Sequence, residues 1–156
     1  MNKLEILRKC NLFRGLNDEQ LSVVEKMSTY EVFEPGVVIC KQGSKADKIW
    51  VIEEGLAGII LQVGPLAQRQ LQSVSSFECF GWSAMIEPHA RTSTVKAIRR
   101  TRVLAFSGQE LCDLCRTNPE LGYKISTAVA RMLGTRLRHA FTQLVGVTSQ
   151  DQLDNF

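Results

Sequence analysis

The sequence lacks any run of roughly 18 apolar residues, which is the length that a helix needs to cross a bilayer. Its first 15 residues are interrupted by charges and lack the continuous apolar core of a signal peptide. These two absences predict a protein that makes no membrane contact and stays in the cytoplasm.

Histidine is scarce, and cysteine follows no framework. A metal-dependent enzyme needs several converging ligands, but His89 and His139 are the only histidines. The five cysteines are scattered, and the pair Cys112 and Cys115 has no second pair to complete a zinc site. No Gly-x-Ser-x-Gly nucleophile motif is present. We therefore expect no metal, no disulfide framework and no enzyme activity.

The excess of positive charge is also small. Nineteen Lys and Arg residues face 16 Asp and Glu residues, so the net charge is +3. A nucleic-acid surface needs basic residues gathered on one face, and the set Lys96, Arg99, Arg100 and Arg102 is more typical of a solvated strand edge. With 156 residues, 44% hydrophobic and 22% charged, the composition is that of one ordinary globular domain.

Periodicity divides the expected single domain, residues 1–146, into three zones. Residues 2–28 favour helices, with Asn17 as a cap and Gln20 completing a capping box. Residues 29–107 favour short strands separated by turn signals. Residues 108–146 favour closing helices, the second capped by Asn118, and residues 147–156 are expected to form a polar tail. The strand-forming runs are Val37 to Cys40, Ile49 to Ile52, Leu56 to Leu61, Arg69 to Val74, Thr92 to Ala97 and Arg102 to Phe106.

The segment from Gly81 to Val95 carries the most informative chemistry. Gly81 permits a close backbone approach to a ligand, and the sequence after it predicts one helical turn whose free N–H groups can bind an anion. Arg91 then enters a strand, where its guanidinium can form two hydrogen bonds to a phosphate. These parts suit one compact phosphate group held inside a β-roll.

This segment resembles the phosphate-binding cassette of the cyclic nucleotide-binding domain family. That family includes regulatory subunits of cyclic-nucleotide-dependent kinases and sensor domains of catabolite-activator-type transcription factors. Two upstream segments, Phe33 to Gly43 and Asp47 to Gly55, resemble the family's hairpins, in the family's order. The positions that match the cassette without a gap are Gly81, Ala84, Met85, Arg91, Thr94 and Val95.

The resemblance implies a mainly β fold with flanking helices. It consists of an eight-stranded β-roll of the double-stranded β-helix or jelly-roll type, with N-terminal helices, an inserted cassette helix and a long C-terminal helix. It also implies a sensor that binds cAMP or cGMP and signals through its C-terminal helix. The implied ligand-binding residues are Gly81, Trp82, Ser83, Ala84, Arg91, Thr92, Ser93 and Thr94.

Trp82 departs from the family pattern. The family has a glutamate there that grips the ribose 2′-hydroxyl, and an indole cannot accept that hydrogen bond. We expect Trp82 to pack in the core, with stacking on a ligand ring or filling of the pocket as alternatives. The second hypothesis is therefore a degenerate module that has no nucleotide ligand and acts in protein interaction or dimerisation.

The apolar stripe near the C-terminus is longer than the roll alone needs. It spans about five turns, and the resemblance to activator-type sensors favours a homodimer through this helix. Too few residues follow Val145 for a helix-turn-helix, so no DNA-binding domain is expected in this chain. Two interpretations are left: a stand-alone sensor, or the sensor part of a truncated transcription regulator. The stripe consists of Ile125, Val129, Leu133, Leu137, Phe141 and Leu144.

Overall fold

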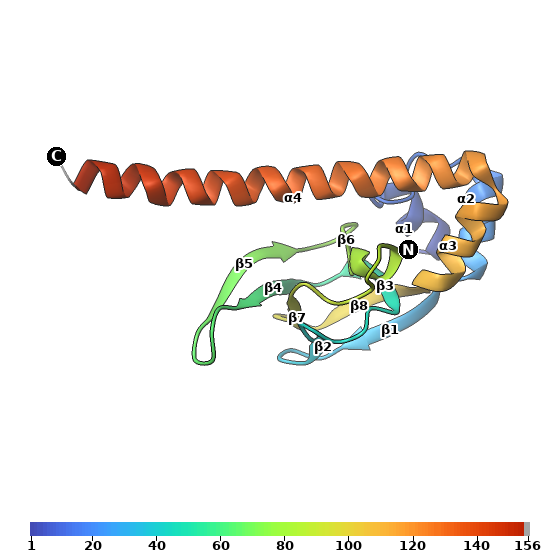
Figure 1. The fold of residues 1–156 in the computed structure, drawn as a ribbon. Coiled ribbons are helices and arrows are strands. Elements are labelled where there is room, and N and C mark those ends of the chain that lie inside the picture. The colour runs from blue at the N-terminus through green and yellow to red at the C-terminus, as the bar shows by residue number, and fades with distance from the viewer. Residues whose placement is uncertain (155–156) are drawn as a thin grey trace.

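A computed structural model describes the backbone of residues 1–154 and the side chains of residues 1–146. Within these residues, helices cover a roll of two antiparallel sheets with four strands each, and one long helix passes over the roll (Figure 1). The predicted eight-stranded β-roll with N-terminal helices, an inserted cassette turn and a long C-terminal helix is confirmed.

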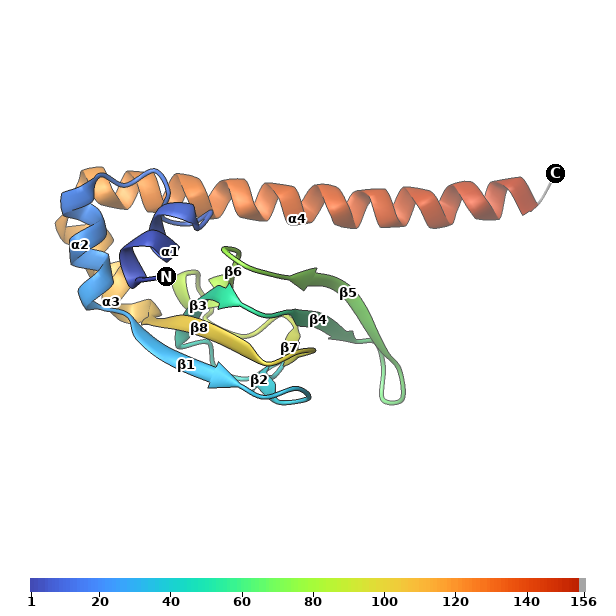
Figure 2. The ribbon, with the colours of Figure 1, turned by 180° about the vertical axis from the view of Figure 1, so that it is seen from behind.

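The N-terminal helices begin where the sequence supplies caps. Helix α1 covers Lys3–Lys9 and α2 covers Asp18–Lys26. Asn17 accepts a hydrogen bond from the N–H of Gln20, whose side chain accepts one from the N–H of Asn17, so the predicted capping box is confirmed. The elbow between the two helices buries apolar side chains and fixes the helices against the roll (Figure 2).

The roll is closed by long-range strand pairing. The first sheet has the order β1-β8-β3-β6 and the second has the order β2-β7-β4-β5. Strands β1 and β6 are the two that no predicted run covers, because β1 is mostly exposed and β6 has only two residues. The strands are β1 Thr29–Phe33, β2 Val38–Cys40, β3 Lys48–Glu54, β4 Ala57–Gln62, β5 Gln68–Val74, β6 Cys79–Phe80, β7 Thr94–Ala97 and β8 Thr101–Ser107.

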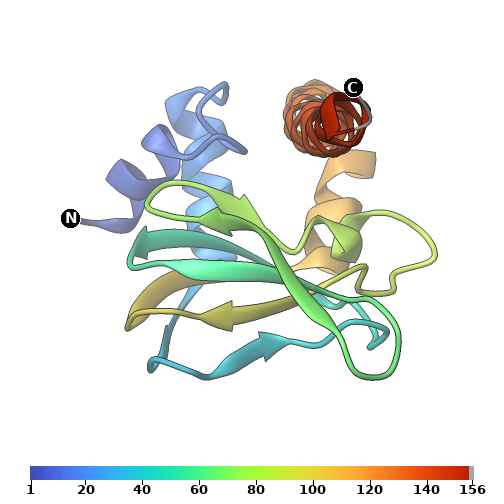
Figure 3. The same ribbon diagram turned by 90° about the vertical axis from the view of Figure 1, so that its left-hand side faces the viewer.

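Two apolar cores hold these parts together. One lies between the two sheets and includes Trp50, Phe80 and Val103. The larger one joins the first sheet to the helices and includes Phe13 and Phe106, whose ring centroids are 5.1 Å apart. The roll is therefore fixed to its helices by packing, and this places the cassette beneath the long helix (Figure 3).

The closing helices are α3, Gly108–Thr117, and α4, Pro119–Asp154. The Asn118 side chain accepts a hydrogen bond from the N–H of Leu121, which confirms the predicted cap. The expected end at residue 146 is wrong, because α4 continues to Asp154. No proline interrupts residues 147–154, and polar residues there have ordinary helix propensity, so the backbone hydrogen-bond ladder continues.

The predicted apolar stripe of α4 does not stay on one face. Its members are mostly four residues apart, so each is turned about 40° from the one before, and Phe141 is turned about 160° from Ile125. Ile125 and Val129 are buried against the roll, whereas Leu137 and Phe141 are more than half exposed. The stripe therefore begins on the covered side of the helix and ends on the side that faces away from the roll.

Candidate functional site

A cavity of about 270 Å³ lies between the cassette, the second sheet and α4. We call it the cassette cavity. Among the residues whose side chains are described, no aspartate or glutamate lines it, whereas two arginines, from the cassette and from α4, do. Its lining residues are Cys40, Ile59, Leu61, Leu71, Gln72, Phe80, Gly81, Trp82, Ser83, Arg91, Thr92, Ser93, Val95 and Arg136.

Gly81 opens the cassette in a conformation that favours glycine. Its φ is +89°, in the left-handed region. A Cβ there would lie 2.9 Å from Cε3 of Trp50 and 3.0 Å from the backbone oxygen of Lys48. Both the torsion angle and the space therefore require glycine, because the backbone at position 81 lies close to Trp50 and Lys48; a close approach to a ligand stays a prediction.

After Gly81 the chain forms the predicted helical turn, a 3-10 helix, η1, over Trp82–Met85. The N–H of Ala84 donates to the oxygen of Gly81 at 3.1 Å. Among the described residues, the N–H groups of Trp82 and Ser83 have no hydrogen-bond partner. The turn has only four residues, so these two free donors, rather than a helix dipole, make it able to hold an anion.

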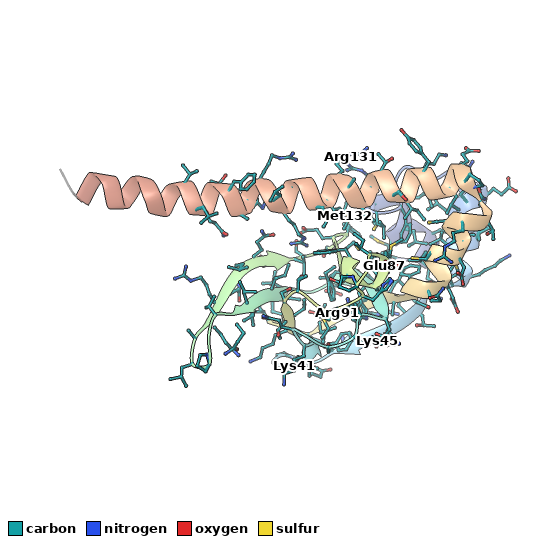
Figure 4. The ribbon with its side chains drawn as sticks, viewed as in Figure 1. Lys41, Lys45, Glu87, Arg91, Arg131 and Met132 are labelled. Carbon is teal, nitrogen blue, oxygen red and sulfur yellow. The ribbon has the colours of Figure 1, made fainter. Side chains whose placement is uncertain are left out.

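Arg91 is held at the back of the same cavity. Its Nη1 donates to the oxygen of Gly81 at 3.0 Å, and its Nη2 donates to the oxygen of Lys48 at 2.7 Å. Its guanidinium also lies over the ring of Trp50, with Cζ 4.9 Å from the centroid. These contacts fix the guanidinium inside the roll, where Figure 4 shows it.

The charge of Arg91 is buried with little compensation. Arg91 is only 5% exposed, and burial lowers the pKa of its guanidinium. Its Nε has no hydrogen-bond partner among the described residues, and Oδ1 of Asp47, an exposed carboxylate, is 4.0 Å away. A buried cation whose hydrogen bonds go to neutral carbonyls is stabilised by an anion placed beside it.

Trp82 does not pack in the core as expected. It is half-buried and lines the cassette cavity, whereas Trp50, which is 4% exposed, stacks on Phe80 in the core. Composition and local pattern do not distinguish these two tryptophans. Trp82 therefore lies beside the space in which a ligand would lie.

The structure gathers most of the predicted site residues but not all of them. Ala84 is buried against the backbone near Gly108 and does not line the cavity. Thr94 is outside the lining too, because its Oγ1 accepts a hydrogen bond from the N–H of Gln42 at 3.0 Å. The predicted residues that do line the cavity are Gly81, Trp82, Ser83, Arg91, Thr92 and Ser93.

Sequence reasoning missed the wall opposite the cassette. Leu71 and Gln72 come from β5, and Arg136 comes from α4. Nη1 of Arg136 donates to Oε1 of Gln72 at 2.7 Å, so this pair joins the helix to the roll across the cavity. No local motif marks these residues, because only the path of α4 over the roll brings them together.

The described residues show two further absences. No helix among them is long and apolar enough to cross a membrane. No group of three or more His, Cys, Asp or Glu side chains in this part of the chain is arranged to hold a metal ion.

Comparison with known proteins gives a consistent result. Residues 30–118 match the family profile of the cyclic nucleotide-binding domain. A CRP-like cAMP-activated global transcriptional regulator of Mycobacterium tuberculosis is 23% identical over 147 residues, which is 94% of this chain and 64% of that protein. A Rhodopseudomonas palustris protein assigned as a potassium channel is 27% identical over 86% of this chain and 32% of its own length. The chain thus spans about one third to two thirds of these relatives.

Solved structures show the same fold. A Geobacter metallireducens protein assigned as a cyclic nucleotide-binding protein is 31% identical, with a TM-score of 0.77, and the match covers 88% of this chain and 99% of that one. A cyclic nucleotide-binding domain from Methylobacillus flagellatus has a TM-score of 0.80 at 20% identity, over 92% of this chain and 80% of that one. Similarity therefore extends beyond the cassette to the arrangement of the whole roll.

Proposed function

This chain belongs to the cyclic nucleotide-binding domain family, and from that premise we propose that its cassette cavity binds a cyclic nucleotide, cAMP or cGMP. The observation that carries the proposal is the buried guanidinium of Arg91. It lies beside the cavity, and its one nearby carboxylate, that of Asp47, is exposed and 4.0 Å away, so a phosphate diester would supply negative charge on the cavity side.

The rest of the cassette supports the same placement of the phosphate. The free N–H groups of Trp82 and Ser83 lie at the cavity, and Thr92 and Ser93 add hydroxyl groups to its lining. An anion in this site would meet neutral donors and the cations of Arg91 and Arg136, and no carboxylate of the described lining would repel it.

We propose that the base of the nucleotide lies toward α4. The apolar wall of Ile59, Leu61 and Leu71 can receive a purine, and Arg136 closes that side from the helix. A ligand that touches both the roll and α4 binds one position of the helix better than another, which is the condition for a shift in population. Faster or slower amide hydrogen exchange in α4 on addition of cAMP would support this step, and unchanged exchange would oppose it.

We further propose that the signalling unit is a homodimer formed through α4. Beyond the roll-facing residues, the helix presents small and apolar side chains at alternating spacings of four and three, the repeat that packs two helices together. These residues lie on the side that faces away from the roll, and they are Ala130, Gly134, Leu137, Phe141 and Leu144. A face of this kind can pair with the same face of a second copy about a twofold axis.

The cell compartment and the lack of catalysis remain part of this proposal. The five cysteines are free, and Cys10 and Cys79 are buried, which suits the reducing environment of the cytoplasm. The regulatory relatives favour a binding role over an enzymatic one.

One observation favours a second candidate, a module without a nucleotide ligand. Trp82 lines the cavity at the position where the family pattern has its ribose-binding glutamate. In that case the fold would serve protein interaction or dimerisation alone.

Thermal unfolding with cAMP, cGMP and uncharged adenosine separates the two candidates. A ligand at 100 times its dissociation constant adds about 2.7 kcal/mol of stability, which raises the melting temperature of a chain of this size by about 5–10 °C. We expect such a rise with one cyclic nucleotide and none with adenosine. No rise with either cyclic nucleotide would favour the interaction module.

A further inference from the structure

A second cavity of about 550 Å³ lies between α4, β5 and the elbow that joins α1 to α2. We call it the helix–roll cavity. Its size is within the range of roughly 300–1,000 Å³ that is typical of small-molecule sites. It is lined by Asn11, Arg14, Leu71, Gln72, Ser73, Glu78, Ala128, Arg131, Met132, Thr135, Arg136, His139, Thr142 and Gln143.

The cavity exists because the roll-facing side of α4 changes character along its length. Up to Met132 this side is apolar and buried, but at the next turns it carries Thr135, His139 and Gln143, which do not pack into the core. Side-chain hydrogen bonds hold the helix to β5 instead, and Nε2 of Gln143 donates to the oxygen of Leu71 at 3.0 Å. The space between helix and strand is therefore spanned by polar groups at its edges and remains open in its middle.

The lining is strongly basic. Arg14 comes from the elbow, and Arg131 and Arg136 come from α4, with His139 one turn further along. Among the described residues, the only carboxylate in the lining is Glu78, whose Oε1 accepts hydrogen bonds from the N–H and Oγ of Ser75. Three guanidinium groups thus share one cavity with a single carboxylate.

Two of these three guanidinium groups are available to a ligand. Among the described residues, the guanidinium groups of Arg14 and Arg131 form no hydrogen bond and no ion pair, whereas Nη1 of Arg136 donates to Gln72. A dianionic group can form hydrogen bonds and ion pairs with several guanidinium groups at once, and a phosphomonoester carries close to two negative charges near neutral pH. A carboxylate carries only one.

Another part of the lining is apolar. Leu71, Ala128 and Met132 form it, and Figure 4 labels Met132 and its neighbour Arg131 on the stretch of α4 that passes over the roll. A ligand that fits this cavity therefore combines a phosphate with a flat or apolar body.

We propose that the helix–roll cavity is a second ligand site, separate from the cassette, for a small organic phosphomonoester. Arg14 and Arg131 hold the phosphate, and the apolar part of the lining receives the body of the ligand. Because Arg14 belongs to the elbow and Arg131 to α4, the ligand joins the N-terminal helices to the long helix. The two cavities share Leu71, Gln72 and Arg136, so these three residues are left unchanged in the test.

The test is calorimetric titration of the full chain with AMP, a phosphomonoester with a planar base, and with adenosine as the uncharged control. Four proteins are compared: the wild type, Arg91→Ala, the double variant Arg14→Ala/Arg131→Ala, and the double variant Arg69→Ala/Arg99→Ala. The last variant removes the same charge from exposed positions that line neither cavity. Titration of each protein with cAMP reports separately on the cassette.

We expect AMP to bind Arg91→Ala and the Arg69→Ala/Arg99→Ala control, and to bind Arg14→Ala/Arg131→Ala at least tenfold more weakly. Adenosine should bind none of them measurably. Loss of AMP binding in Arg91→Ala with retention in Arg14→Ala/Arg131→Ala would overturn the proposal, because AMP would then use the cassette. Absence of AMP binding to any of the proteins would also overturn it, whatever cAMP does.

Discussion

Arg91 is a buried cation whose guanidinium both holds the backbone of the cassette and places a positive charge beside the cassette cavity. Two of its N–H groups hold the backbone oxygens of Gly81 and Lys48, and so they fix the start of the cassette to strand β3. The charge of the guanidinium lies beside the cassette cavity, and its Nε has no hydrogen-bond partner among the described residues. Under the proposed function, the same residue would then be needed both for the shape of the site and for its ligand.

The requirement for glycine at position 81 can be measured against a control in the same protein. Gly36 has nearly the same φ, +88°, but nothing lies within 4 Å of the Cβ that alanine would add, whereas at Gly81 Trp50 would be 2.9 Å away. We expect Gly36→Ala to cost about 1 kcal/mol of unfolding free energy, from the torsion alone. Gly81→Ala should cost about 1–3 kcal/mol more, from the clash.

Urea unfolding of both variants measures these values. Equal costs at the two positions would mean that Trp50 and the Lys48 carbonyl move aside freely, and that the cassette is not held by this close approach.

Trp82 sets a second expectation at this scale. The family has a ribose-binding glutamate at this position, and an indole cannot accept a hydrogen bond from the ribose 2′-hydroxyl. The wild type should therefore bind cAMP and 2′-deoxy-cAMP with affinities within about twofold of each other. The variant Trp82→Glu should prefer cAMP by about tenfold, because a hydrogen bond to a charged group contributes about 1.5–3 kcal/mol.

Calorimetric affinities for the two nucleotides give this ratio, and Trp82→Gln serves as an uncharged comparison. A wild-type protein that already prefers cAMP by tenfold would show that another group holds the hydroxyl.

Helix α4 is the element in which sequence and structure differ most. The caps Asn17 and Asn118 were predictable because capping depends on neighbouring residues. The gradual turn of the apolar stripe around the helix was not predictable. Residues four apart suggest one helix face over a short segment, but each step of four turns by about 40°, so over a long straight helix the stripe moves to another face. The wall that Leu71, Gln72 and Arg136 add to the cassette cavity was equally invisible, since it depends on which strand the helix crosses.

The exposed end of the stripe predicts an effect on association. Glutamate at Leu137 and Phe141, which are 53% and 55% exposed, would place charges in the contact between two copies of α4. We expect the double variant Leu137→Glu/Phe141→Glu to be monomeric, or to dimerise at least 100-fold more weakly, because a core helix contact loses several kcal/mol when charges replace it.

Sedimentation equilibrium measures this change, with Leu66→Glu, at the 98% exposed tip of the β4–β5 hairpin, as the control. A wild-type chain that sediments as a monomer at concentrations near 100 µM, roughly the level at which weak contacts form, would contradict the proposed homodimer.

At the scale of the whole molecule, the fold was largely predictable and the ligand pockets were not. Three motifs in order, from Phe33 to Gly43, Asp47 to Gly55 and Gly81 to Val95, were enough for the roll, because each depends on local turns and strand patterns. The helix–roll cavity depends on the distance between two elements that are far apart in sequence, and no local pattern encodes it.

The larger core also makes the stability of the molecule depend on pH. Burial raises the pKa of the Cys10 thiol from 9.0 to about 11, and burial raises that of Cys79 as well. The unfolded chain loses these protons near pH 9, while the folded chain keeps them, so this contribution is full below about pH 9 and disappears as the pH rises toward 11. For Cys10 alone the loss is about 2–3 kcal/mol.

Urea unfolding in the presence of reductant, between about pH 8 and pH 10.5, tests this dependence. The variant Cys10→Ala/Cys79→Ala should be less stable at every pH but should lose less stability over the alkaline range. An alkaline loss equal to that of the wild type would assign the effect to other groups.

The most direct test of the account is calorimetric titration of cAMP and cGMP into the wild type, Arg91→Ala and Arg99→Ala. Arg99 is an exposed arginine that lines neither cavity, so it controls for the loss of one positive charge. We expect one of the two nucleotides to bind the wild type and Arg99→Ala equally. We expect it to bind Arg91→Ala at least 100-fold more weakly, because that substitution removes a buried, charged hydrogen-bond partner. Binding that is unchanged in Arg91→Ala, or absent from the wild type for both nucleotides, would contradict the claim that the buried guanidinium holds the phosphate of a cyclic nucleotide.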